Sequence, residues 1–119
     1  MAKGIVIYYS RSGNTKQMAE MIAKAMNEGG LVSDCKELAK VTIDGLLKYD
    51  AIVMGSPTYY GGMAAEMKKL IDDAVVKHGQ FDGKVGAAFT SAANIGGGNE
   101  TTVLGILQAM IIGGMIIQG

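Results

Sequence analysis

The feature that most constrains this chain is the regular alternation of short apolar runs with segments of helical periodicity. Apolar runs, mostly β-branched, occupy residues 4–9, 31–35, 51–55, 85–89 and 115–118. Helical spacing of apolar residues occupies 14–28, 63–77 and 100–112, with a weaker helical turn at 43–48. Buried parallel strands are continuous apolar runs, and alternating strands and helices form a parallel sheet with right-handed crossovers. The sequence therefore predicts an α/β fold with a doubly wound, five-stranded parallel sheet.

Length and composition limit the kind of protein this is. The chain of 119 residues is expected to form a single domain, residues 1–119, and its 49% hydrophobic content is enough for a core. Eleven basic and eleven acidic residues give a net charge of zero, so no nucleic-acid partner is expected. A single cysteine, Cys35, excludes a disulfide within the chain.

No part of the sequence predicts a membrane or metal protein. The most apolar stretch, 103–117, is shorter than the roughly 20 residues that span a bilayer, and no secretory signal is evident at the N-terminus. We therefore expect a cytoplasmic protein without membrane insertion. No His, Cys and carboxylate cluster has metal-ligand spacing. The helix predicted at 14–28 has apolar residues at Met18, Met21, Ile22, Ala25 and Met26, which we expect to pack against the core.

Three polar segments leave predicted strands at the same edge of the sheet. They are SRSGNT (10–15), SPTYYGG (56–62) and TSAANIGGGNETT (90–102). In an open parallel sheet, ligands bind beyond the carboxyl ends of the strands, where the strand order reverses. Each segment alone also suits ordinary helix capping. Three of them at one edge favour a binding site.

The first segment suits a single phosphate group. Backbone N–H groups at a helix start, together with the helix dipole, favour an anion, and Gly13 allows a tight turn. Arg11 either adds a charge-assisted bond or points into solvent. The nucleotide signature G-x-x-x-x-G-K-[ST] and the dinucleotide signature G-x-G-x-x-G are both absent here. A phosphate monoester therefore fits better than a pyrophosphate.

The second and third segments suit a planar ring. Tyr59 and Tyr60 precede two glycines, so they either form a flat wall for the ring or are ordinary half-buried tyrosines. The third segment offers Ser91, Asn94 and the glycines at 96–98, which present backbone groups without bulk. Together with the phosphate loop, these segments predict a phosphorylated aromatic cofactor.

On these motifs the chain resembles flavodoxin-fold proteins that bind flavin mononucleotide (FMN). YYSRSGNTKQMAE, AIVMGSPTYYGGMAAEMKKLID and AAFTSAANIGGGNETTVLGILQAMIIGGMIIQG are most similar to the branch of NAD(P)H:quinone oxidoreductases named after the tryptophan-repressor-binding protein. The resemblance covers nearly the whole chain and implies the strand order 2-1-3-4-5. It also implies that FMN is held by three sets of residues: Ser10, Arg11, Ser12, Gly13, Asn14 and Thr15 at the phosphate; Pro57, Thr58, Tyr59, Tyr60 and Gly61 at the isoalloxazine; and Ser91, Ala92, Ala93, Asn94, Gly96 and Gly97 at its other edge.

The implied activity is hydride transfer from NAD(P)H through FMN to a quinone or similar acceptor. The alternative is a flavodoxin-type single-electron carrier without NAD(P)H activity of its own. Neutral charge, and the lack of an aromatic residue between Thr90 and Thr102, favour the reductase because one flavin face would stay open to a second planar molecule. No residue is predicted to be catalytic, and we expect His78 to be structural.

The end of the sequence departs from the family pattern. The family fold closes with a helix after the fifth strand, whereas this sequence ends at Gly119. The outer side of residues 85–89 and 115–117 is therefore expected to lack a covering helix. Such an apolar face needs a partner, so we expect a homo-oligomer. The alternative is a truncated chain that binds FMN weakly.

Overall fold

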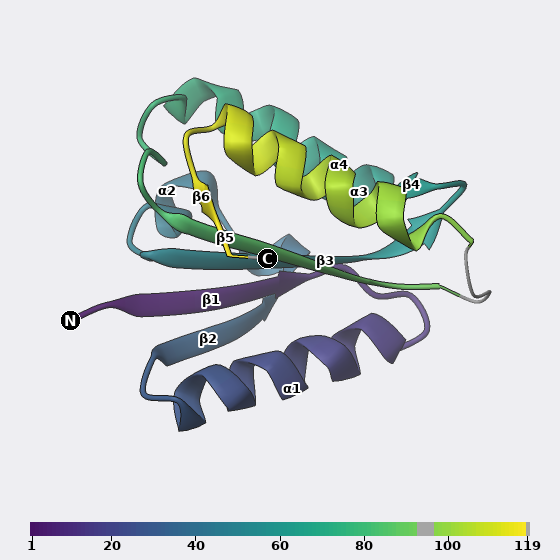
Figure 1. The fold of residues 1–119 in the computed structure, drawn as a ribbon, viewed down its shortest axis with the longest axis horizontal. Helices are drawn as coiled ribbons and strands as arrows, with labels where there is room; N and C mark the ends of the chain where they lie inside the picture. Colours follow the sequence, from purple (N-terminus) through teal and green to yellow (C-terminus); the bar gives the residue numbers. More distant parts are fainter. Residues whose placement is uncertain (93–96, 119) are drawn as a thin grey trace.

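The computed structural model describes residues 1–92 and 97–118, which form an α/β fold around one sheet. The strands lie in the order β2-β1-β3-β5-β6, with the short β4 paired only to β3 (Figure 1). All pairs in the main sheet are parallel. The predicted order 2-1-3-4-5 is therefore confirmed for the parallel strands. Their bounds are β1 Lys3–Tyr8, β2 Val32–Glu37, β3 Ala51–Tyr59, β5 Val85–Ser91 and β6 Ile116–Ile117.

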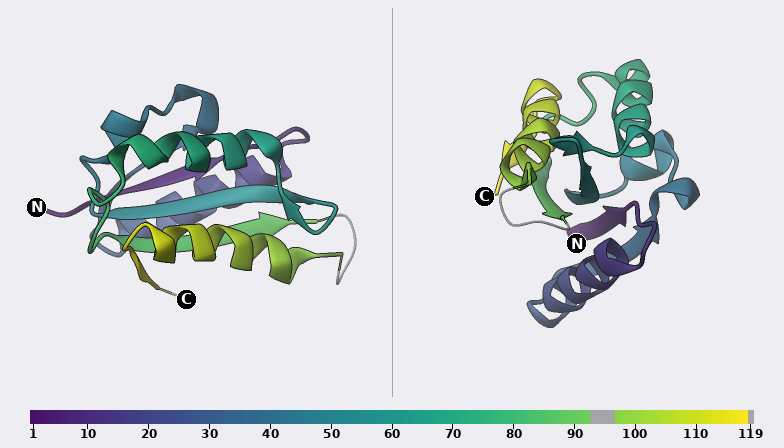
Figure 2. Two further views of the ribbon diagram at one scale, coloured as in Figure 1. Left: turned by 90° about the horizontal axis from the view of Figure 1, so that it is seen from above. Right: turned by 90° about the vertical axis from the view of Figure 1, so that its right-hand side faces the viewer.

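Helices cover both faces of the sheet. Helix α1 (Asn14–Glu28) lies on one face, and α3 (Ala65–Asp73) and α4 (Asn99–Ile112) lie side by side on the other (Figure 2). The short α2 (Ile43–Leu46) packs on the α3–α4 face through Leu46. Single turns of 3₁₀ helix, η1 (Leu38–Lys40) and η2 (Ala74–Lys77), follow β2 and α3.

Helix α1 has the predicted bounds but a different packing face. Its buried residues are Thr15, Ala19 and Ala23, which lie one turn apart along the helix. Small alanines let the helix approach the sheet closely, and Met18, Ile22 and Met26 flank this contact. The prediction that Met21 and Ala25 pack in the core is wrong: both are exposed, Met21 by 71%.

The segment predicted as a loop at 56–62 is a β-hairpin. Strand β3 continues through Pro57 and Thr58 to Tyr59, which pairs with Gly62 in the antiparallel strand β4 (Gly62–Met63). The two turn residues, Tyr60 and Gly61, have φ of 50° and 76°. Positive φ at both positions is typical of the type I′ turn that matches strand twist. The helix predicted from Met63 therefore begins only at Ala65, and its last turn, from Ala74, is 3₁₀.

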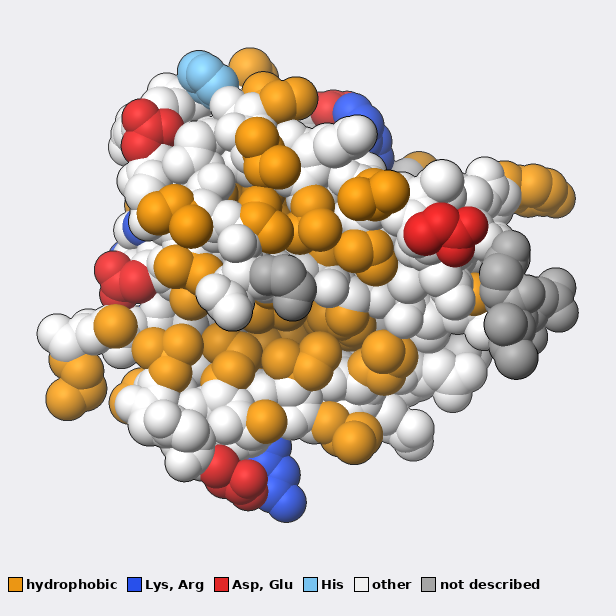
Figure 3. Space-filling view, in the orientation of Figure 1, with side chains coloured by type: hydrophobic (Ala, Val, Ile, Leu, Met, Phe, Trp, Pro, Cys, Tyr) orange, Lys and Arg blue, Asp and Glu red, His pale blue; other side chains and the backbone are white. Residues whose placement is uncertain are grey.

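The α1 face of the sheet is bare in part. Phe89 is only 8% exposed and packs with the cluster beneath α1, so the prediction of an uncovered outer side is wrong at this residue. The reason is Gly55: a Cβ there would lie 1.9 Å from Phe89 Cζ, so the ring crosses β3 towards α1. Further out, Val85 is 38% and Ile116 61% exposed, and no helix follows β6 within residues 97–118. Hydrophobic side chains gather along this side of the molecule (Figure 3).

Candidate functional site

The three polar segments meet at the carboxyl edge of β1, β3 and β5. The backbone N–H of Tyr9 donates to Gly55 O at 3.1 Å, which holds the first segment beside β3. The hydroxyls of Thr15 and Ser91 lie 2.9 Å apart and join the first segment to the third. The hydroxyls of Thr58 and Thr90, 2.8 Å apart, join the second to the third. The clustering predicted from the strand order is therefore present.

The start of α1 offers backbone donors for an anion. Gly13 has φ of 95°, and its N–H donates to Ser10 Oγ at 3.0 Å, which shapes the turn before the helix. Within the described residues no side chain caps the helix at this end. A Cβ on Gly13 would meet no atom within 4 Å, so the space in front of the turn is open. These features fit the phosphate of FMN, because uncapped amides at a helix start favour an anion.

The side chains of the first segment surround this turn unevenly. Arg11, Ser12 and Asn14 are exposed and Ser10 is partly buried. Thr15 is only 2% exposed and shares a hydrogen bond with Ser91. The exposed position of Arg11 agrees with the outward alternative. Thr15 therefore has a structural role between two segments besides any contact with a ligand.

The hairpin presents an aromatic side chain at the same edge. Its base is fixed by Ser56, which is fully buried: Ser56 Oγ accepts from Ala64 N at 2.8 Å and donates to Pro57 O at 2.9 Å. At its tip Tyr60 is fully exposed and Tyr59 is exposed by 36%. The half-buried alternative is therefore wrong for Tyr60, whose ring is free to contact a ligand.

The start of α4 packs against this hairpin, which the sequence does not reveal. Thr101 Oγ1 donates to Gly61 O, and Thr58 Oγ1 donates to Asn99 Oδ1 at 3.3 Å. Gly98 has φ of 102°, and a Cβ there would lie 2.5 Å from Gly61 Cα. Asn99 and Thr101 were not predicted as site residues, since their spacing resembles ordinary helix capping. Ser91 is the last residue of β5, Ala92 and Gly97 are the described residues on either side of 93–96, and Ala93, Asn94 and Gly96 lie outside the described residues.

Two tyrosines at the site stay protonated at neutral pH. A hydrogen bond to Glu66 raises the pKa of Tyr9 above its ordinary 10.0, and the nearby Arg11 opposes this only in part. Burial raises the pKa of Tyr8. Both phenols are therefore neutral where the first segment leaves β1.

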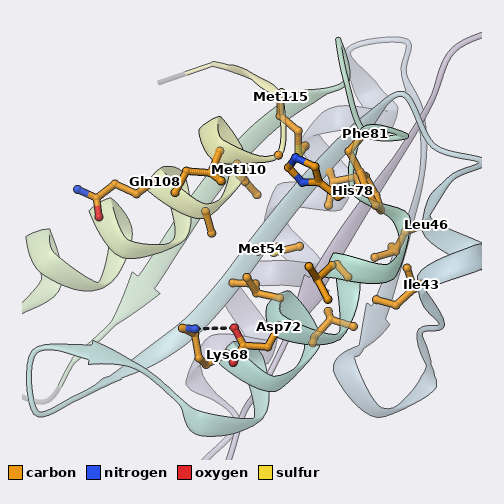
Figure 4. A pocket seen from close by; sticks show the side chains of 18 of the residues that line it. Ile43, Leu46, Met54, Lys68, Asp72, His78, Phe81, Gln108, Met110 and Met115 are labelled. Atoms are coloured by element: carbon orange, nitrogen blue, oxygen red, sulfur yellow. Dashed lines mark hydrogen bonds and ion pairs between the residues drawn. The ribbon is translucent and has the colours of Figure 1, made fainter.

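A cavity of about 590 Å³ lies away from this edge. It opens between α3 and α4, over Ile52 and Met54 of β3 (Figure 4). Gly105, Ala109 and Gly113 line its α4 wall at four-residue intervals, and their small size leaves the space open. No described residue predicted to bind FMN lines it. The cavity is therefore separate from the candidate site.

Within residues 1–92 and 97–118, no group of three or more His, Cys, Asp or Glu side chains is placed to hold a metal ion. Among the helices of the same residues, none has both the length and the apolar character needed to cross a membrane.

Comparison with known proteins gives consistent matches. A flavodoxin domain family model matches residues 5–93. The chain is 36% identical to an NAD(P)H dehydrogenase (quinone) of Rhodopseudomonas palustris (strain HaA2), over the whole chain and 71% of that protein. It is 38% identical to a protein of the same name from Azorhizobium caulinodans, with the same coverage. Both alignments run over 141 residues against 119 here, so both relatives have additional residues inside the aligned region.

Solved structures match the fold over nearly the whole chain. A flavodoxin from the domain Archaea is 34% identical with a TM-score of 0.85, covering 98% of this chain and 78% of that one. A WrbA-like flavodoxin from Agrobacterium tumefaciens is 26% identical with a TM-score of 0.86, covering 98% and 76%. The family model matches residues 5–93, and both relatives align with the whole chain. The chain belongs to the flavodoxin domain family.

Proposed function

We propose that this chain binds FMN at the carboxyl edge of its sheet and uses it for NAD(P)H-dependent reduction of quinones or similar acceptors. The observation that carries the proposal is the meeting of three segments there: an uncapped helix start, a hairpin with an exposed tyrosine, and the end of β5. The names of the relatives support the choice of donor and acceptor.

The chain's own part in this reaction is to bind and orient. When bound, FMN would supply the redox chemistry, which is hydride transfer from NAD(P)H and two-electron reduction of the acceptor. The amides at the start of α1, with Ser12, Asn14 and Thr15, would hold its phosphate. Tyr59 and Tyr60 would hold the isoalloxazine ring. Tyr9 is a neutral phenol at pH 7, and the hydrogen bond to Glu66 raises its pKa further, so it adds no negative charge beside the phosphate.

A reductase fits better than an electron carrier because one flavin face would be open. The segment from Thr90 to Thr102 contains no aromatic residue, so this chain supplies a ring from the hairpin side only. A nicotinamide or a quinone is planar and could stack on the other face. The carrier remains the second candidate, and it shares every FMN contact.

The first experiment separates the phosphate contact from the ring contact. We would titrate FMN and riboflavin into the protein and into Thr15→Val, with Thr15→Ser as the control that keeps the hydroxyl. Hydrogen bonds to charged groups contribute about 1.5–3 kcal/mol, so Thr15→Val should weaken FMN roughly tenfold or more and riboflavin much less. Thr15→Ser should bind FMN nearly as the parent does. Equal losses for both ligands in Thr15→Val would contradict the phosphate assignment, because they would reflect only the lost bond to Ser91.

The second experiment tests the activity. Anaerobic addition of NADH or NADPH to the FMN-loaded protein should bleach its visible absorbance, and a quinone should restore it. A yellow protein that neither nucleotide bleaches would favour the carrier.

We also propose that the chain forms a homo-oligomer. Val85 and Ile116 expose apolar surface beside the α1 helix, and burial of such surface contributes about 25 cal/mol per Å². A second copy that covered this face would remove it from water.

A further inference from the structure

The turn at the tip of the hairpin is unusual for the residue that it contains. Tyr60 is the one non-glycine residue with positive φ in the described part of the chain, and its side chain is fully exposed. The first position of a type I′ turn favours Gly, which has no Cβ, and Asn or Asp, whose short polar side chains hydrogen-bond locally; a bulky residue such as tyrosine is strained there. Because its side chain is fully exposed, Tyr60 gains no burial energy within its own chain that would offset this strain. The surrounding structure must therefore hold the turn in place.

The start of α4 is the part of the fold that holds this turn. Thr101 Oγ1 donates to Gly61 O and lies 2.9 Å from Gly98 O. Its single hydroxyl hydrogen serves one of these carbonyls at a time, so the hydroxyl links the turn to the residue before α4. Gly98 approaches so closely that a Cβ would lie 2.5 Å from Gly61 Cα. The contact joins residues 40 positions apart.

Other parts of the hairpin are fixed independently of Thr101. Its base is held by Ser56 and Ala64, and its first strand by the hydroxyls of Thr58 and Thr90. Within the described residues, Thr101 is the side chain that hydrogen-bonds the turn itself. Loss of this hydroxyl should therefore free the tip while the rest of the hairpin keeps its place.

We propose that Thr101 is a positioning residue that presets the Tyr60–Gly61 turn, and with it the Tyr60 ring, for the planar ring of the flavin. This inference rests on the proposed function, since the flavin is the ligand. Ordering a turn before binding lowers the entropy that binding would otherwise cost. Loss of the Thr101 hydroxyl should weaken the contact with the flavin ring and leave the phosphate contacts unchanged. The reason is that Thr101 contacts the hairpin and not the start of α1.

The test uses Thr101→Val, which keeps the shape and removes the donor, and Thr101→Ser, which restores the donor. FMN and riboflavin are titrated into each protein, and both the affinity and the residual fluorescence of the fully bound flavin are measured. A tyrosine ring stacked on an excited flavin quenches its fluorescence. Chemical unfolding of each apoprotein checks that all three proteins are folded.

We expect Thr101→Val to weaken FMN and riboflavin by the same factor, about two- to fivefold, since the bond is exposed to water. Its bound flavin should be brighter than in the parent, and Thr101→Ser should rescue both values. A merely structural role would lower stability without changing the brightness of the bound flavin.

Two results would overturn the proposal. One is a Thr101→Val protein whose affinity for both flavins and whose bound-flavin fluorescence equal those of the parent. The other is a Thr101→Ser protein whose affinity and fluorescence equal those of Thr101→Val. In both cases the parent still binds flavin, so the proposed function stands. A parent that binds neither flavin would overturn the proposed function together with this role.

Discussion

At the scale of single residues, one hydrogen bond links β2 to the residues before β3. Tyr49 is 6% exposed, and its hydroxyl donates to the carboxylate of Asp34 in β2. This bond is the main reason that the pKa of Tyr49 is raised from 10.0 to about 12. Lys3 Nζ lies 5.7 Å from the centroid of the same ring. The protonated phenol is therefore part of the packing at the start of β1.

The raised pKa predicts how stability depends on pH. Because the folded protein holds the Tyr49 proton more tightly than the unfolded chain, the bond stabilises the fold fully below about pH 10. This contribution should be lost as the pH rises towards about 12. The difference in tyrosinate absorbance between the parent and Tyr49→Phe should give the titration of Tyr49, and Asp34→Asn should move it downward. A Tyr49 that titrates near 10 in the folded parent would contradict the bond.

At the scale of secondary-structure elements, α4 contains a glycine that its geometry does not require. Gly105 lies in the helix interior, and a Cβ there would meet Met63 Cε at 3.6 Å, which is ordinary contact. Glycine inside a helix costs about 0.5–1 kcal/mol relative to alanine. Gly105→Ala should therefore raise the free energy of unfolding by about that amount in urea titrations.

Gly98→Ala is the matched control for this prediction. Gly98 precedes the same helix with φ of 102°, and its Cβ would clash with Gly61. This substitution should lower stability and weaken flavin binding. A Gly105→Ala protein that is less stable than the parent would show that the α3–α4 cavity does not tolerate the added methyl group.

The elements differ in how well the sequence predicts them. Helix α1 was predicted to the residue because a glycine precedes it and Gly29 and Gly30 follow its last residue. The β3–β4 hairpin was missed because its turn begins with tyrosine, where local patterns predict Asn, Asp or Gly. The end of the helix predicted at 63–77 also differs, since its last turn, Ala74–Lys77, is 3₁₀ and not α-helical.

The candidate site was predictable in place but not in its internal contacts. Glycine, serine and threonine after three strands, together with the strand order, predicted where the segments meet. The bonds from Thr15 to Ser91 and from Thr101 to Gly61 join residues 76 and 40 positions apart. No local pattern encodes such pairs, because they depend on how the crossovers place each segment. The cover that Phe89 obtains through Gly55 was missed for the same reason.

At the scale of the whole molecule, the α1 face predicts association. Ile116 is 61% and Val85 38% exposed at the β6 side of the sheet. We expect sedimentation at low micromolar concentration to show an oligomer, and Ile116→Lys to shift it towards monomer, because a charge in a buried interface is costly. Met21→Lys is the control, since Met21 is an exposed apolar residue, 71% exposed, that belongs to α1 and not to β5 or β6. A folded parent that sediments as a monomer would contradict the proposal.

The ring of Phe89 over Gly55 also restricts the order in which the two positions can change. Alanine at position 55 would collide with the ring, and overpacking of this kind typically costs about 1–3 kcal/mol. Leucine at position 89 lacks the colliding ring atoms, so Gly55→Ala should cost less in a Phe89→Leu background. A double-mutant cycle should give a coupling of about 0.5–3 kcal/mol, whereas additive effects would show that the ring moves aside freely. In evolutionary terms the two positions are epistatic. A lineage can acquire alanine at position 55 with little loss of stability only after Phe89 has been replaced by a residue without an aromatic ring.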